Sequence, residues 1–246
     1  MRSSRRGQVD PFIVMDVMEQ ARALEASGRS VIHMEVGQPG TPAPAGARQV
    51  LARAMEAGPL GYTVALGLPE LRAGIAALYR RWYGVDLNSE RVVVTAGSSA
   101  AFLLSFTTLF DAGDRVGVGE PGYPSHRQIL RALSLEPVGL PAAPENRLQP
   151  VPADFAGVDL QGLIVASPGN PSGTMLGRDR LSALMQAAAE RDIAFISDEI
   201  YHGLHYGDRA VTALEVSDDV HIVNSFSKYF SMTGWRVGWM VVPEDH

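Results

Sequence analysis

No cysteine occurs in the 246-residue sequence. This absence excludes disulfide bridges, thiolate metal ligands and cysteine nucleophiles, and it fits a reducing compartment, so we expect a cytoplasmic protein. Long hydrophobic runs are also missing, because no stretch approaches the roughly 18 to 20 apolar residues that a membrane-spanning helix requires. Asp10, Pro11 and Asp16 interrupt the segment after the basic start, so we expect no secretory signal peptide.

Clustered positive charge is scarce as well. The chain has 21 basic against 27 acidic residues, a formal net charge of −6, and its basic cluster is the opening MRSSRRG. Proteins that bind nucleic acid or an anionic membrane usually carry a larger basic patch. We therefore predict neither partner and no metal site, and we expect a small-molecule ligand. Apolar residues form 46% of the chain, which is enough for a sizeable core.

Short β-branched runs alternate with helical patterns over most of the chain. Helical spacing of apolar residues appears in the segments 14–24, 47–58, 68–83, 100–110, 125–133 and 178–192. Strand-like runs occupy 91–96, 114–120, 162–168, 193–200, 221–226 and 235–243. This alternation predicts an α/β fold with a mostly parallel, doubly wound sheet flanked by helices. In such folds ligands collect at the carboxyl ends of the strands.

Small polar residues follow the first of these strands. Gly97, Ser98 and Ser99 lie between a predicted strand and a predicted helix. Free N–H groups at a helix start, the helix dipole and two hydroxyls together favour a bound phosphate. The alternative is an ordinary helix start, with Ser98 or Ser99 as the N-cap after a glycine turn.

Two further strands end in polar residues. Asn170 follows the run 162–168 in a turn whose prolines and glycines need no functional explanation, yet its amide would suit a ligand oxygen. Asp198 ends the run 193–198, and a carboxylate there is costly unless a cation or donors meet it. We expect a positive group to face Asp198, with Tyr201 nearby if the chain turns helical. The alternative for Asp198 is a helix N-cap.

The segment after the last parallel run is the most informative. Ser225, Ser227 and Lys228 follow an apolar strand, and Arg236 comes eight residues after the lysine. An isolated lysine is usually a solvated surface residue. Here its position after a strand, between hydroxyls and aromatic rings, suits an amine that forms a covalent imine.

Together these residues describe one ligand with three chemical groups. The ligand would have a phosphate, an aldehyde captured by Lys228 and a ring cation met by Asp198. Pyridoxal 5'-phosphate has these groups, and we expect it as the cofactor. The predicted phosphate contacts are Ser98, Ser99, Ser225, Ser227 and Arg236.

At this point the sequence resembles the class I and II aminotransferases, of the aspartate-aminotransferase-like superfamily and fold type I. The resemblance rests on seven segments in the family's order, and ordered segments are far more specific than any one alone. They are GQPGTPAP, GYTVALGLPELR, TAGSSAAF, EPGYPSHR, SPGNPSG, SDEIYHGL and SFSKYFSMTGWRVGW.

The resemblance implies catalytic roles for Lys228, Asp198 and Tyr201. Lys228 would form the internal aldimine and then carry the proton between the substrate Cα and the cofactor. Asp198 would keep the pyridine nitrogen protonated, and Tyr201 would contact the ring's phenolic oxygen. We expect burial and the cationic cofactor to lower the pKa of Lys228.

The same resemblance implies further contacts. Asn170 would bond the phenolic oxygen, and Tyr123 would stack on the ring face. Tyr62 would reach the phosphate of a neighbouring subunit, so a homodimer is part of the prediction. Gly37 would approach the carboxylate of the substrate through its backbone.

The expected organisation is an N-terminal arm and helix at 1–36 and a cofactor-binding large domain at 37–246. The family's smaller C-terminal domain, which carries the arginine that binds the substrate carboxylate, is expected to be absent. The predicted activity is transfer of an amino group between an amino acid and a 2-oxo acid. The alternatives are a pyridoxal-phosphate lyase of the same fold and a truncated, non-catalytic cofactor-binding fragment.

Overall fold

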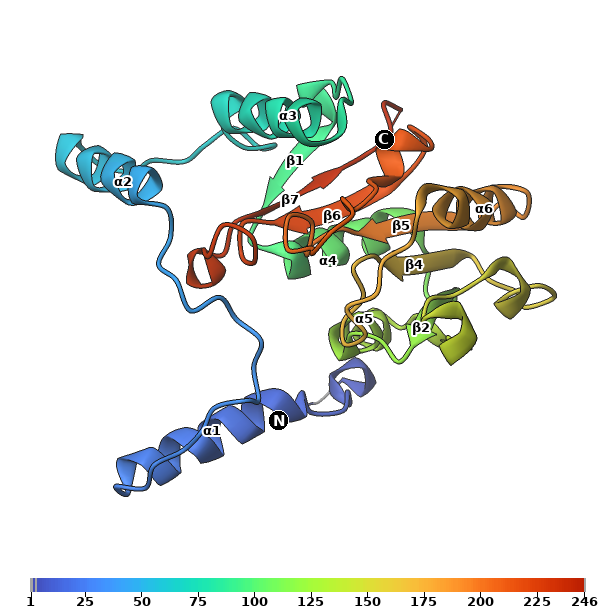
Figure 1. Cartoon of the computed structure of the whole chain (residues 1–246), viewed down its shortest axis with the longest axis horizontal. Helices are drawn as coiled ribbons and strands as arrows, with labels where there is room; N and C mark the ends of the chain where they lie inside the picture. The colour runs from blue at the N-terminus through green and yellow to red at the C-terminus, as the bar shows by residue number, and fades with distance from the viewer. Residues whose placement is uncertain (1, 3, 246) are drawn as a thin grey trace.

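The computed structural model describes residues 2 and 4–245 and places a seven-stranded sheet at the centre of the chain (Figure 1). The strands lie in the order β1-β7-β6-β5-β4-β2-β3. Their bounds are β1 Val92–Thr95, β2 Arg115–Glu120, β3 Glu136–Pro141, β4 Gly162–Ala166, β5 Ala194–Asp198, β6 His221–Ser225 and β7 Gly238–Val241. The predicted α/β class and the predicted strands are confirmed.

The sheet is mostly parallel, with one strand reversed. The pairs β2–β3, β2–β4, β4–β5 and β5–β6 are parallel, whereas β7 runs antiparallel to both β1 and β6. Strand β3 is not among the predicted runs, since Pro137 and Pro141 interrupt its apolar pattern. It is an edge strand, where the missing N–H groups of proline are tolerated.

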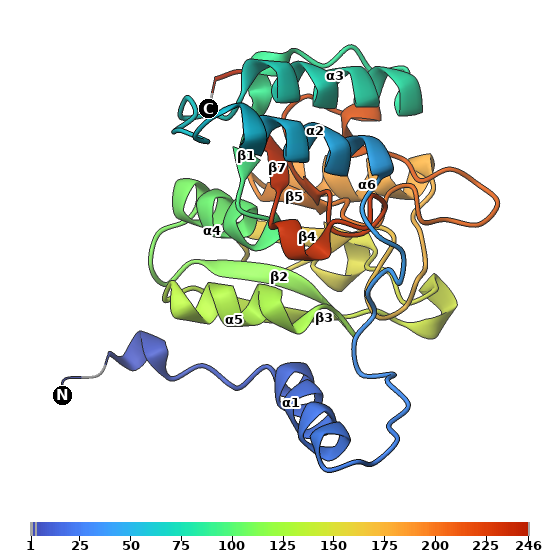
Figure 2. The ribbon, with the colours of Figure 1, turned by 90° about the vertical axis from the view of Figure 1, so that its left-hand side faces the viewer.

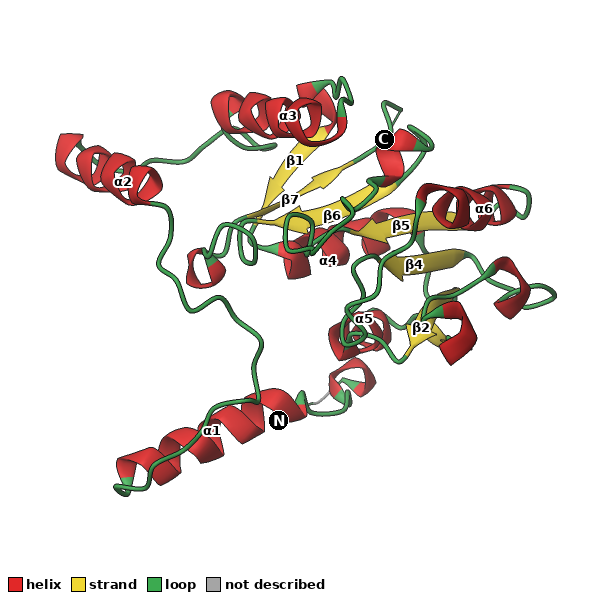
Figure 3. Ribbon diagram, viewed as in Figure 1, coloured by secondary structure: helices red, strands yellow, loops and turns green. Residues whose placement is uncertain are grey.

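Helices cover both faces of the sheet (Figure 2). Helices α3 and α6 pack on one face, and α4 and α5 pack on the other. Helices α1 and α2 belong to the N-terminal part of the chain and stand away from the sheet (Figure 3). The bounds are α1 Ile13–Ala26, α2 Ala45–Ala57, α3 Pro69–Tyr83, α4 Ser98–Leu109, α5 Pro124–Ala132 and α6 Arg178–Ala189.

Local sequence explains where the helices begin, end and pack. Helix α3 starts with Pro69 at its first position and ends before Gly84, which has a φ of +72°. On α6 the predicted apolar stripe is buried against the sheet, and burying each larger side chain contributes roughly 1.5–3 kcal/mol. That stripe consists of Leu181, Leu184, Met185 and Ala188.

The N-terminal segment touches the body near α5. The Arg131 side chain donates to Asp10 over 2.5 Å, and the rings of Phe12 and Tyr123 meet edge to face at 6.0 Å. Much of the apolar surface of α1 stays exposed, including Ile13 and Met15. Within the described residues, no helix combines the length and the apolar character needed to cross a membrane.

Candidate cofactor site

The predicted polar residues gather at the carboxyl edge of the parallel strands. Asp198 and Ser225 are the last residues of β5 and β6, and the segment carrying Asn170 leaves the end of β4. Parallel pairing aligns β4, β5 and β6 side by side. Groups that are 27 residues or more apart in the sequence therefore lie along one edge.

Lys228 lies at this edge and is the only lysine in the sequence. Its Nζ donates a hydrogen bond to the carbonyl oxygen of Gly37 over 3.0 Å and lies 5.8 Å from the ring centre of Tyr201. The contact brings the predicted substrate-side residue Gly37 to the lysine. Burial, followed by the neighbouring Arg236 cation, lowers the pKa of Lys228, in the direction expected for an imine-forming amine.

Asn170 and Tyr201 come together as a pair. The Asn170 amide donates to the Tyr201 hydroxyl oxygen over 3.2 Å, which leaves the Tyr201 proton available for another acceptor. Burial and the charge of Asp198 raise the pKa of Tyr201 to about 12, so the phenol keeps its proton at neutral pH. The pair can therefore donate to an anionic oxygen placed next to it.

Asp198 is almost fully buried, with 4% of its surface exposed. One carboxylate oxygen lies 3.1 Å from Nε2 of His126, and the other accepts the backbone N–H of Ile200 over 3.2 Å. His126 thus contacts the carboxylate inside the protein, and the expected positive group stays a prediction. No helix begins at Asp198, because the chain passes into a turn, so the helix N-cap alternative is wrong.

His126 is a site residue that the sequence reasoning missed. It lies on α5, three residues after Tyr123, and its ring meets those of Phe102 and Tyr123 edge to face at 4.5 Å and 5.4 Å. The only signal in the sequence was its place in the segment EPGYPSHR. The contact with His126 and the hydrogen bond from the Ile200 N–H together fix the position of the Asp198 carboxylate. Tyr123 is half-buried next to it.

The start of α4 brings uncapped backbone N–H groups close to the Arg236 cation. Gly97, with a φ of +79°, is the N-cap, and no side chain caps the helix, so the alternative of an N-cap by Ser98 or Ser99 is wrong. Ser98 is half-buried and Ser99 is exposed at the first turn. A Cβ at Gly97 would collide with the Arg236 guanidinium. The positive φ therefore favours glycine at this position, and a larger residue would also displace the Arg236 side chain.

Arg236 joins this helix start to the lysine segment. Its Nη1 donates to the Thr233 carbonyl oxygen over 2.9 Å and lies 3.5 Å from the Ser227 hydroxyl. The Ser225 hydroxyl accepts the N–H of Ser227 over 3.1 Å and so shapes the same turn. Arg236 thus lies beside Ser227 and the Gly97 turn that precedes Ser98, while the Ser225 hydroxyl acts on the backbone of Ser227. The phosphate contacts themselves stay predictions.

Tyr62 is not brought to the site within this chain. It lies on the loop between α2 and α3 and is fully exposed, at 109% of the reference surface. The predicted contact with a neighbouring subunit therefore stays a prediction.

Gln149 is a second residue that the sequence did not indicate. It is buried before the strand β4, and its Nε2 donates to the carbonyl oxygens of Ala166 and Thr174 over 3.2 Å and 2.8 Å. These two residues flank the turn that carries Asn170. Gln149 therefore stabilises the conformation of this turn through hydrogen bonds to both of its ends.

The arrangement fits pyridoxal phosphate. Among the residues that the structure describes, no carboxylate pairs with Lys228 or Arg236, although both are cationic. The buried carboxylate of Asp198 lies elsewhere on the same edge, and its neutral Tyr201 neighbour offers a proton. A ligand with an anionic phosphate, an aldehyde and a basic ring nitrogen would complement these groups.

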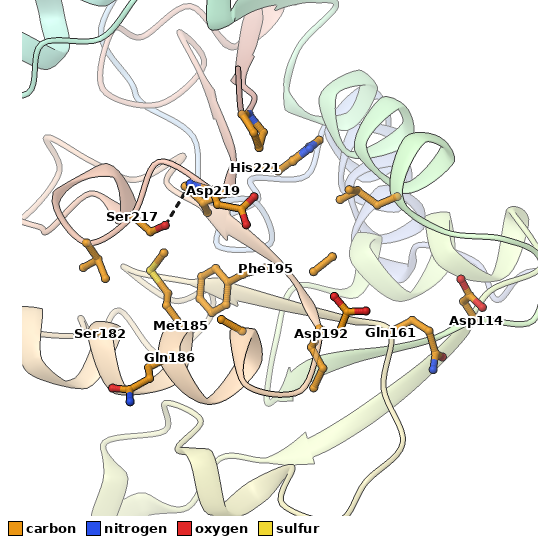
Figure 4. A pocket seen from close by; sticks show the side chains of 17 residues that line it. Asp114, Gln161, Ser182, Met185, Gln186, Asp192, Phe195, Ser217, Asp219 and His221 are labelled. Carbon is orange, nitrogen blue, oxygen red and sulfur yellow. Dashed lines mark hydrogen bonds between the residues drawn. The ribbon is translucent and has the colours of Figure 1, made fainter. Parts of the chain in front are cut away.

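A separate cavity of about 670 Å³ lies at the opposite edge of the sheet (Figure 4). It opens between α6 and the amino ends of β5 and β6, with Met185, Phe195 and His221 among its lining residues. In the described ranges 2 and 4–245, no cluster of three or more His, Asp or Glu side chains has the geometry to hold a metal ion. The cavity shares no residue with the candidate site.

Comparisons with known proteins agree with this geometry. Residues 29–246 match the family model described as aminotransferase class I and II. The chain is 45% identical to a valine–pyruvate aminotransferase of Mycobacterium tuberculosis, over 98% of this chain and 63% of that protein. It thus spans less than two thirds of that relative's length.

Solved structures of aminotransferases are also similar to this chain. A putative aminotransferase from Silicibacter pomeroyi is 65% identical with a TM-score of 0.92, over 100% of this chain and 64% of that chain. An aspartate aminotransferase from Thermus thermophilus is 32% identical with a TM-score of 0.93, over 100% and 66%. The chain belongs to the class I and II aminotransferases.

Proposed function

We propose that this chain holds pyridoxal phosphate covalently on Lys228 and transfers an amino group between an amino acid and a 2-oxo acid. The observation that carries the proposal is the position of the chain's only lysine. Its amine has a lowered pKa, no carboxylate partner among the described residues, and the Asn170–Tyr201 pair beside it. When bound, the cofactor would supply an aldehyde for amine addition and a ring that accepts electron density.

The surrounding residues would bind the phosphate, contact the cofactor ring and transfer the proton. Arg236 and the α4 start would hold the phosphate, and Asp198, oriented by His126, would hold a proton at the ring nitrogen. Tyr201 would donate its proton to the ring oxygen. Once the substrate has displaced it, the Lys228 amine would be the nearest base for the proton at the substrate Cα.

Amino transfer is favoured over elimination by the relatives, which include a valine–pyruvate aminotransferase and an aspartate aminotransferase. We propose an aliphatic amino acid as donor, because the relative named for valine and pyruvate is 45% identical, against 29–34% for relatives named for aspartate.

The test is a half-reaction with purified protein loaded with pyridoxal phosphate. Valine, alanine and aspartate are added separately, and the cofactor and organic acids are quantified by chromatography. We expect pyridoxamine phosphate and the matching 2-oxo acid to form in equal amounts, fastest with an aliphatic donor. Ammonia release without pyridoxamine phosphate would instead indicate a lyase. Bound cofactor that yields neither pyridoxamine phosphate nor ammonia would indicate the non-catalytic, cofactor-binding alternative.

We also propose a homodimer. Tyr62 is surrounded in sequence by exposed apolar side chains, and a contiguous exposed set of this kind is typical of an interaction surface. The set is Leu60, Val64, Leu66 and Leu68. We expect light scattering after gel filtration to give twice the 26.4 kDa chain mass, and Val64→Asp to shift the population toward monomer. A matched Tyr206→Asp change, at an exposed loop position after β5, should leave the mass unchanged. A monomeric wild-type chain at all concentrations would contradict the proposal.

A further inference from the structure

A cluster of buried polar side chains lies behind the Asp198–Tyr201 turn and has no part in the proposed function so far. Glu199 and His202 are 1% and 2% exposed. Burying ionisable groups is costly unless their hydrogen bonds are satisfied, so their arrangement needs an explanation. Thr212 and Tyr79 are buried next to them.

Glu199 is held by donors from two segments. One carboxylate oxygen accepts the Ala213 N–H over 2.8 Å, and both oxygens lie 2.9 Å from the Thr212 hydroxyl. The Ser197 hydroxyl is 3.2 Å away. Burial raises the pKa of Glu199 to about 8 despite these donors, and the charge of Asp198 adds to the rise.

The hydrogen bonds of His202 define its tautomer. Its Nε2 lies 2.9 Å from the carbonyl oxygen of Ser167, which can only accept, so Nε2 carries the proton. Burial lowers the pKa of His202 to about 4, so the ring is neutral and Nδ1 is an acceptor. The Tyr83 hydroxyl, 2.6 Å from Nδ1, must then be the donor. A directed chain runs from Tyr83 through His202 to Ser167.

The network joins the two segments that carry the ring contacts. Ser167 lies three residues before Asn170, and Glu199 lies between Asp198 and Tyr201 in the chain. The Asn170–Tyr201 hydrogen bond links the same segments on the open side. His202 also approaches Glu199, with Nδ1 3.5 Å from the carboxylate. The network therefore holds the turn on its buried side, and the Asn170–Tyr201 hydrogen bond lies on its open side.

We propose that Glu199, His202 and Tyr83 form a positioning network that sets the Tyr201 hydroxyl and the Asp198 carboxylate against the cofactor ring. None of the three touches the ring, so they act through Tyr201 and Asp198. The inference rests on the proposed function, because it assigns these residues to the same site.

The test uses wild type, Glu199→Gln and Tyr83→Phe, each loaded with pyridoxal phosphate. Tyr83→Phe removes one hydroxyl and Glu199→Gln removes one ionisation, with little change in shape. The first readout is the pH midpoint of the visible cofactor band. A loosened Tyr201 donates less well to the ring oxygen, so the nitrogen joined to Lys228 becomes more basic. We expect the midpoint to rise by about 1 unit and the cofactor Kd to rise about tenfold.

A second readout uses the cofactor-free protein. The usual pKa of 4.5 for Glu199 is raised to about 8 on folding. The folded state therefore holds an extra proton between these values, and stability falls as pH rises through this range. Asp198 and His202 face the carboxylate from its own segment, and Tyr79 and Tyr83 face it from α3. We expect Glu199→Gln to remove most of this decline in the urea midpoint between pH 5.5 and 8.5.

The outcomes separate the two claims. A wild-type chain that forms no band would overturn the proposed function. If wild type forms the band and the variants titrate within about 0.2 unit of the wild-type midpoint, the proposed network is wrong and the proposed function stands. Lower stability of the variants would not rescue the network, because a merely structural role lowers stability without moving the midpoint. Tyr206→Phe, a change at a fully exposed phenol, is the matched control and should titrate like wild type.

Discussion

Replacing Lys228 with alanine is expected to abolish the covalent cofactor band and to slow the half-reaction by roughly 10³-fold or more. The reason is that the sequence holds no second lysine, so no other ε-amine can form the linkage or return the proton. Absorbance before and after borohydride, followed by peptide mass analysis, measures the attachment. In wild type we expect the added mass on the peptide that contains Lys228.

Lys228→Arg is the informative companion variant. It keeps a cation beside Arg236 and the Gly37 carbonyl but cannot form an imine. We expect it to retain weak, non-covalent cofactor binding and to show no reducible band. If borohydride still attached cofactor to either variant, the covalent assignment would be wrong. Attachment at the N-terminal amine is distinguished by the same peptide analysis.

The second large effect is expected at Asp198. Asp198→Asn replaces a buried carboxylate with a neutral amide that cannot stabilise a proton on the ring nitrogen. We expect cofactor Kd to rise by about 10- to 100-fold, the loss of one charge-assisted hydrogen bond, and the half-reaction rate to fall by about 10²–10³-fold. Isothermal titration and rapid-mixing absorbance measure the two quantities.

The control for this variant is Asp208→Asn, an exposed carboxylate after the same strand. It should leave both quantities within about twofold of wild type. Circular dichroism checks that Asp198→Asn still folds, since His126 then faces an amide oxygen that can accept the same hydrogen bond. Unchanged affinity and rate in a folded Asp198→Asn protein would refute the proposed role of this carboxylate.

The contrast between β3 and β7 shows what local patterns can predict. The apolar, β-branched run around β7 marked a strand, but its antiparallel direction depends on how the chain returns between β6 and β1, which no local pattern contains. Strand β3 was missed because Pro137 and Pro141 break its pattern. Only its edge position makes those prolines acceptable.

The candidate site also contains residues that local sequence patterns indicate and residues that they do not. Asp198, Asn170 and Lys228 were found because each follows a strand, and parallel strands end at one edge. His126 and Gln149 were missed because their functions arise from contacts across 72 and 17 positions of sequence. A histidine or glutamine on its own is an ordinary residue, so the sequence carried no distinctive signal for either.

The sequence by itself determined the fold class and was enough to predict the cofactor and the role of Lys228, because these follow from periodicity and from ordered segments that are local in the chain. The tertiary structure decided which partners complete them: His126 behind Asp198, Gly37 at Lys228, Arg236 against Gly97, and the Tyr83–His202–Glu199 network behind the turn. Those partners come from segments far apart in sequence, and only packing around a common sheet brings their polar atoms within hydrogen-bonding distance.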